Sequence, residues 1–267
     1  MYFVYYRKNN KTNSFFRRLR TVNNIKPSIN LQNQFSKIIF LIIVISSSLF
    51  SACSEKEGEV TPIDGRFEYN PLEVGFFREY EITLRDTSFL SNTDTTFFMK
   101  ELVSEQESTN RGEEYIIHRF YKANKADTYK TSPDTIWKSI ITPGSFINVE
   151  NNIRFVRLKF PPELSLEWDG NEENNSNSHI YSIDSLDIPY TLHDTLNFEK
   201  TLFVSHTRKL TLIDTNIVFE RYAEDVGLIE RHILNSTYGL SGLNFTLETL
   251  FLYSQKIISS GYESISE

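Results

Sequence analysis

Cysteine is nearly absent from this chain, since only Cys53 among its 267 residues carries a thiol. A single cysteine excludes an intramolecular disulfide and any zinc or iron–sulfur site built from several thiolates. Alanine is almost as scarce and occurs only at positions 52, 123, 126 and 223. Because alanine is the strongest helix former, its scarcity argues against a helical bundle.

The motifs of common enzymes are also missing. The sequence has no Gly-x-Ser-x-Gly elbow, no Walker loop and no dinucleotide-binding glycine fingerprint. The 35 acidic residues are too numerous for any pair of them to indicate glycoside hydrolysis. No two histidines have the i, i+2 or i, i+4 spacing of common metal sites; they are His118, His179, His193, His206 and His232. The sequence therefore predicts no enzymatic activity, no cofactor and no metal.

Charge divides sharply along the chain. The first 52 residues contain eight basic side chains and no acidic one, whereas the part from Cys53 onward has 20 basic and 35 acidic side chains. That second part carries about −15 with neutral histidine. Because its basic residues are scattered and its net charge repels phosphate backbones, we do not expect nucleic acid as a partner.

Residues 37–53 have the order of a bacterial export signal. Lys37 precedes the apolar run Ile38–Phe50, which is followed by the small residues Ser51 and Ala52 and then by Cys53. As a helix this run would span roughly 20 Å, short of the roughly 30 Å hydrocarbon core, so a permanent transmembrane helix is the weaker interpretation. The run ends in Leu49-Phe50-Ser51-Ala52-Cys53, which resembles the lipobox of bacterial lipoproteins, although Phe50 replaces the usual Leu, Val or Ile.

Lipidation of Cys53 is the expected consequence. Cleavage before Cys53 and acylation of its thiol would hold the protein to a membrane, because several buried acyl chains anchor a soluble domain stably. The following Ser54-Glu55-Lys56-Glu57 loosely resembles the acidic export signal of surface lipoproteins in Bacteroidota. We therefore expect a lipid-anchored outer-membrane protein, on the cell surface rather than on the periplasmic face.

After this segment, apolar and polar residues alternate as they do in half-buried strands. Tyr80–Leu84, Val156–Phe160 and Ile217–Tyr222 are examples, and turn formers such as Ser91–Asp94 and Asp169–Ser178 separate such stretches. The pattern predicts an all-β fold, either an antiparallel sandwich or a strongly curved half-barrel. We expect three parts: an N-terminal extension with the signal peptide (1–52), an acidic tether (53–66) and one β-rich domain (67–267). The aromatic residues expected in its core are Trp137, Phe155, Phe160, Trp168 and Tyr222.

Asp-Thr pairs recur through the domain, at 86–87, 94–95, 127–128, 134–135, 194–195 and 214–215. A structural explanation is that Asp favours a turn and Thr the first position of a strand. Four sites also resemble the O-glycosylation motif of exported Bacteroidota proteins, and their hydroxyls belong to Thr95, Thr135, Ser185 and Thr195. Thr95 is the best candidate because it follows a predicted polar turn, while Thr135 is expected to be less exposed beside Trp137.

The stretch Asn70–Tyr80 resembles the PLxxGxxWxY opening of a family of uncharacterised lipoproteins from Bacteroidota, with Phe77 in place of the usual Trp. The likeness covers most of residues 67–257 and continues in order through Asp134–Trp137, Glu150–Pro161, Trp168–Asn171 and Tyr222–Arg231. It brings no activity or catalytic residue with it. The motifs look like packing signatures, in which Gly75 and Gly227 permit tight backbone geometry.

Three functions remain open. The leading hypothesis is a non-enzymatic envelope lipoprotein that binds an envelope protein or a glycan, or that has a structural role. The second is a carrier of lipid or of a hydrophobic segment, which would require an apolar cavity of several hundred cubic ångströms. The third is a glycan-active enzyme, which would require a polar cleft with two opposed carboxylates.

Overall fold

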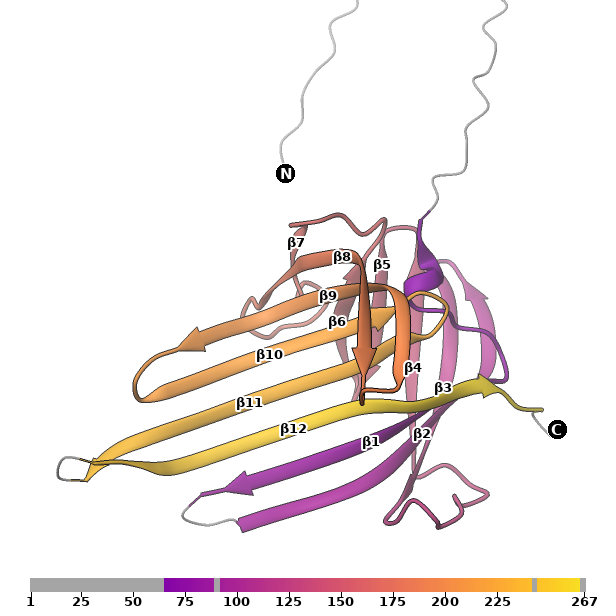
Figure 1. The fold of residues 1–267 in the computed structure, drawn as a ribbon. Coiled ribbons are helices and arrows are strands. Elements are labelled where there is room, and N and C mark those ends of the chain that lie inside the picture. Colours follow the sequence, from indigo (N-terminus) through magenta and orange to yellow (C-terminus); the bar gives the residue numbers. More distant parts are fainter. Residues whose placement is uncertain (1–64, 89–91, 242–243, 265–267) are drawn as a thin grey trace, which may run out of the picture. The chain divides into compact units, whose positions relative to one another are not determined.

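The computed structural model describes residues 65–88, 92–241 and 244–264. The predicted signal peptide, Cys53 and nearly all of the acidic tether lie outside these residues. Within the described part of the chain, the one helical element is the short 3-10 helix η1 (Phe67–Tyr69), and the rest of the regular structure consists of strands (Figure 1).

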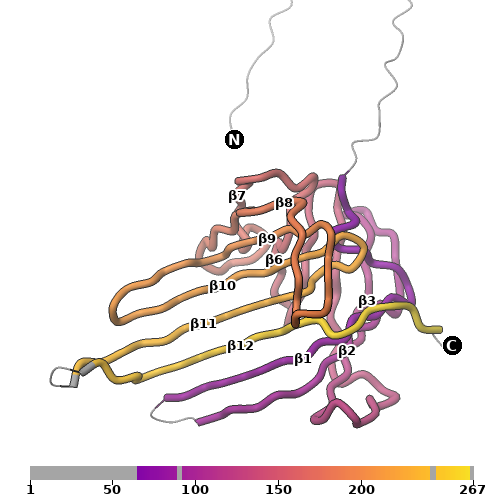
Figure 2. Tube along the Cα trace, in the orientation of Figure 1, coloured from indigo at the N-terminus to yellow at the C-terminus, as the bar shows by residue number. Residues whose placement is uncertain are grey.

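The twelve strands are β1 (Phe76–Thr87), β2 (Asn92–Thr109), β3 (Gly112–Lys122), β4 (Thr135–Thr142), β5 (Ser145–Glu150), β6 (Ile153–Lys159), β7 (Glu167–Asp169), β8 (Ile180–Leu192), β9 (Leu196–Leu210), β10 (Asp214–Ala223), β11 (Gly227–Ser241) and β12 (Asn244–Tyr262). They form one sheet in the order β6-β5-β4-β3-β2-β1-β12-β11-β10-β9-β8-β7. Every neighbouring pair is antiparallel. Strands that follow one another in the chain are therefore paired, except for β6 and β7, which lie at the two edges of the sheet. The first strand, β1, and the last, β12, are also paired and join the two halves at the centre (Figure 2).

The two edge strands, β6 and β7, approach each other and nearly close the sheet. The backbone N–H of Val156 donates to the carbonyl oxygen of Gly170 over 2.9 Å. In return, the indole Nε1–H of Trp168 donates to the carbonyl oxygen of Val156, also over 2.9 Å. The all-β antiparallel prediction is thus confirmed, and the strongly curved half-barrel is the architecture that forms, because one continuous sheet leaves no second sheet for a sandwich.

Alternation along the strands fills the interior. In β1, Phe76, Tyr80 and Ile82 are buried, and in β6, Val156 and Leu158 are buried. The buried side chains form two clusters, one of them around Val156 and Trp168 and the other around Tyr80 and Ile229. Burial of this apolar surface is the main stabilising contribution to such a fold.

The predicted core is confirmed for Phe160, Trp168 and Tyr222, which are 7%, 5% and 1% exposed. Trp137 is half-buried and packs against the first cluster. The prediction is wrong for Phe155, which is half-buried and belongs to neither cluster. Phe155 is out of phase with Val156, and the guanidinium carbon of Arg157 lies 4.8 Å from its ring centre.

Two local predictions have different outcomes. Gly75 has a φ of +91°, and a Cβ atom there would lie 2.8 Å from the carbonyl oxygen of Glu263, so this position requires glycine as expected. The turn predicted at Ser91–Asp94 is wrong for its last three residues. Asn92, Thr93 and Asp94 belong to β2 and pair with Thr87, Asp86 and Arg85 of β1, because cross-strand pairing outweighs their local preference for turns.

Candidate functional site

Exposed apolar side chains gather where two neighbouring hairpins end. We call this the hairpin-tip surface, and it consists of Leu210, Leu212, Ile213, Tyr238, Leu240, Phe245 and Leu247. Leu212 is 84% exposed and Leu240 is 68% exposed. The backbone N–H of Tyr238 donates to the carbonyl oxygen of Ile213 over 2.8 Å, so the end of β11 is bonded directly to the turn between β9 and β10. Figure 1 shows these ends of β9–β12 reaching away from β3–β6.

Strand pairing places part of this surface on one face. Tyr238 is paired with Leu247 and Leu240 with Phe245 across β11 and β12. Cross-strand partners have side chains on the same side of a sheet, so these four form one apolar block. A contiguous exposed apolar surface in a soluble domain marks an interaction site. The alternation in Tyr238–Leu247 is as clear in the sequence as it is in the core strands. It does not reveal that no element among the described residues covers this end of the sheet.

The interior of the sheet is filled by side chains. Its cavity, lined by residues that include Arg78, Trp137 and Phe146, has about 30 Å³ open to a water-sized sphere. This volume holds one or two waters and no acyl chain. This cavity is therefore far smaller than the several hundred cubic ångströms that the carrier hypothesis requires.

A buried ion network lies at the centre of this interior. Glu220 is fully buried, and its carboxylate accepts hydrogen bonds from the Tyr222 hydroxyl over 2.6 Å and from Arg231 Nε over 2.7 Å. Arg157 Nη1 lies 3.5 Å from Glu220, and Arg157 Nη2 donates to Glu150 over 2.7 Å. Removing one member would leave a buried charge unpaired, which typically costs about 3–5 kcal/mol.

Two members of the network come from irregular positions. Between β5 and β6, Phe146 pairs with Leu158 and Ile147 with Val156, so Arg157 is the extra residue of a β-bulge. His206 is likewise the extra residue in β9, opposite Val218 and Phe219 of β10. Bulges re-aim side chains, and these two direct Arg157 and His206 toward Glu220.

Ionisation in the network is fixed by its partners. Burial alone would raise the pKa of Glu220, but Arg231 and Arg157 hold it well below its ordinary value. Burial lowers the pKa of His206 below its ordinary value of 6.5, although Glu220 opposes this effect. The His206 ring stacks on Tyr181, with ring centres 3.6 Å apart and planes at 5°. A permanently ionised, fully paired carboxylate beside a neutral histidine suits a structural role better than proton transfer.

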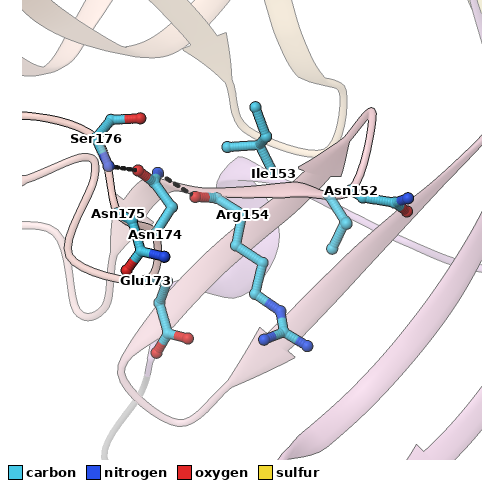
Figure 3. Close-up of a pocket in the computed structure, with 8 residues that line it drawn as sticks. Asn152, Ile153, Arg154, Glu173, Asn174, Asn175 and Ser176 are labelled. Carbon is cyan, nitrogen blue, oxygen red and sulfur yellow. Dashed lines mark hydrogen bonds between the residues drawn. The ribbon is translucent and has the colours of Figure 1, made fainter.

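A second feature is a shallow polar depression between the β5–β6 turn and the loop after β7 (Figure 3). It has a volume of about 580 Å³ and is lined by residues 149, 152–154 and 173–176. Asn174 holds the loop in place, because its Nδ2 donates to the carbonyl oxygen of Arg154 over 2.7 Å and its Oδ1 accepts the N–H of Ser176 over 2.7 Å. Glu173 is the one carboxylate in this lining, so the opposed pair of a glycosidase is missing from it.

The four candidate glycosylation sites all lie within the described residues. Thr95 in β2, Thr135 at the start of β4 and Thr195 in the β8–β9 turn are exposed, whereas Ser185 in β8 is half-buried. The expectation that Thr135 is less exposed beside Trp137 is wrong. Thr135 is exposed because it is the first residue of β4, at the end of the strand. The four lie on different elements, and each remains a separate candidate.

Among residues 65–88, 92–241 and 244–264, no three His, Cys, Asp or Glu side chains converge in a way that could hold a metal ion. The same residues contain no helix of the length and apolar character needed to cross a bilayer.

Comparisons with known proteins assign little to the chain. No protein-family model and no curated protein matches it. It is similar to a solved structure described as "a putative lipoprotein from Parabacteroides distasonis", with 13% identity, coverage of 72% of this chain and 98% of that one, and a TM-score of 0.36. At this TM-score the similarity assigns neither a fold nor a function, so membership of the Bacteroidota lipoprotein family remains a prediction.

Proposed function

We propose that this chain is a lipid-anchored envelope protein that acts without catalysis and binds a protein partner through the hairpin-tip surface. The observation that carries the proposal is the exposure of two cross-strand apolar pairs in β11 and β12, Tyr238 with Leu247 and Leu240 with Phe245. Contiguous exposed apolar side chains of this kind mark interaction sites. Anchoring rests on the sequence order from Lys37 to Cys53. A protein partner fits this surface because apolar and aromatic side chains form the centre of protein interfaces.

The test compares the proteins that co-purify from envelopes of the native host. Leu240→Ser with Phe245→Ser removes two members of the surface that are 68% and 53% exposed, so folding should be unaffected. Leu164→Ser is the matched control, because Leu164 is 62% exposed and lies in the loop before β7. The expected result is one protein retained by the wild type and by Leu164→Ser but lost from the double variant. Equal recovery from all three would contradict a role of this surface in binding.

We also propose that the domain faces outward from the outer membrane, which rests on the resemblance of Ser54-Glu55-Lys56-Glu57 to a surface-export signal. Protease added to intact cells should then degrade the domain. A periplasmic protein included as a control should stay intact in the same cells. Full protection of the domain until the cells are broken would place it on the periplasmic face.

A further inference from the structure

The interior of the sheet contains more guanidinium groups than carboxylates. Arg157 and Arg231 share Glu150 and Glu220, and Arg119 is paired with Glu101. Arg78 has no carboxylate at ion-pair distance among the described residues. With His206 neutral, this leaves one positive charge uncompensated. The charged groups of the interior around Glu220 and Glu101 are Arg78, Arg119, Arg157, Arg231, Glu101, Glu150 and Glu220, and the buried Glu230 is paired separately with Arg221.

The fold holds Arg78 in this position. Its side chain is buried, with 5% of the residue exposed, and its Nη1 donates to Oδ1 of Asn70 over 3.1 Å. Gly227 makes room for the guanidinium, because a Cβ atom at Gly227 would lie 2.3 Å from Nη1. The cross-strand partner of Arg78 is Glu101, which is already ion-paired with Arg119, so one carboxylate serves two guanidinium groups. A buried charge that is only partly compensated is costly, so the placement of Arg78 favours a further anion nearby.

Unpaired donors point to where that anion lies. Nδ2 of Asn70 and Nε of Arg119 are buried without an acceptor, and their residues are 1% and 6% exposed. Both residues, together with Arg78, line the interior cavity of about 30 Å³. Leaving two such donors unsatisfied is unfavourable, and more so for the charged one.

We propose that this cavity binds one small inorganic anion of the size of chloride, held by Arg78, Arg119 and the amide of Asn70. The volume admits one or two water-sized species and excludes phosphate or an organic acid. Water would accept from the two donors but would leave Arg78 and Arg119 with the single carboxylate of Glu101 between them. Glu101 also lines the cavity; burial would raise its pKa, but Arg119 and Arg78 lower it, so this one carboxylate is shared between two guanidinium groups.

The experiment measures thermal unfolding of the purified protein in sodium chloride and in sodium gluconate at equal ionic strength. Gluconate is too large for the cavity. The melting temperature should rise with chloride, by about 3 °C for each tenfold increase above the dissociation constant. Crystals grown with bromide in place of chloride should give an anomalous peak in contact with Arg78 and Arg119.

Two variants separate this site from general salt effects. Asn148→Asp is nearly isosteric, keeps the oxygen that accepts the Ser139 hydroxyl over 2.8 Å, and adds a carboxylate to the cavity lining. Arg78→Met removes the excess charge instead. Each of these two variants should have the same melting temperature in chloride as in gluconate. The control Arg85→Met, at an exposed position of β1, should respond to chloride as the wild type does. An unchanged response in Asn148→Asp and Arg78→Met, or a bromide peak without any dependence of stability on chloride, would overturn the proposal.

Discussion

Trp168 donates its indole Nε1–H to the carbonyl oxygen of Val156 over 2.9 Å, and this bond links the two edge strands of the sheet. Because the N–H of Val156 is bonded to Gly170, both polar backbone groups of Val156 are satisfied across the gap between β6 and β7. The nearly closed shape of the sheet therefore depends on a side chain as well as on strand pairing.

Trp168→Phe should weaken this closure specifically. The substitution keeps an aromatic ring in the core but leaves the buried carbonyl oxygen of Val156 without its indole donor, which should cost about 1–3 kcal/mol. Urea unfolding monitored by circular dichroism would measure the change. Tyr238→Phe, on the exposed hairpin-tip surface, should change the free energy of unfolding by less than about 0.5 kcal/mol. Equal effects of the two substitutions would contradict the role of the indole bond.

The sequence predicted the strand phase well where alternation is regular. Val156, Leu158 and Phe160 are buried as the pattern of β6 predicts, and the closure at Trp168 lies inside a motif identified by family resemblance. Arg157 is different, because the same pattern predicts it to be solvated, yet it is buried as the extra residue of a bulge. A period of two cannot reveal an inserted residue, since the insertion changes the facing without changing composition.

The buried ion network and the hairpin-tip surface were harder to predict from the sequence than the strands. Glu220 and Arg231 pair across β10 and β11 as direct neighbours in register, but 35 acidic residues in the chain hide such a pair. A charged residue inside an otherwise apolar strand, as in Phe219-Glu220-Arg221-Tyr222, was the available signal. The apolar character of the hairpin-tip surface was visible, whereas its exposure depends on which strands cover which face.

His206 should make stability depend on pH. Burial lowers the pKa of His206 in the folded state, so below its ordinary value of 6.5 the unfolded chain binds more protons than the folded one. Stability from this group is therefore present above that pH and is lost as pH falls below it. His206→Phe keeps an aromatic ring against Tyr181 but cannot titrate, and it should lose less stability than the wild type between about pH 7.5 and about pH 5.

The relevant quantity is the slope of the free energy of unfolding against pH, and not its absolute value. The free energy of unfolding would be measured for both proteins across the same pH range, and the two slopes would be compared. Parallel curves would show that His206 does not take up a proton on unfolding.

Thr95 should carry an O-linked glycan if the Asp-Thr motifs are recognised in the native host. Its side chain is exposed on β2, as are Thr135 and Thr195 at their own sites, whereas Ser185 is half-buried and should be modified least. Mass spectrometry of peptides from protein purified from that host would locate any sugar, and Thr95→Val would remove the corresponding mass. Unmodified peptides covering all four sites would leave turn and strand preference as the explanation of the repeats.

Lipidation of Cys53 tests the account most directly, because the proposed function depends on a domain held at a membrane. Cells expressing the wild type or Cys53→Ala would be fed a labelled fatty acid, and the protein would be followed in membrane and soluble fractions. We predict that the wild type is labelled and sediments with membranes, while Cys53→Ala is unlabelled. A Cys53→Ala protein that keeps its label and its membrane association would contradict the account.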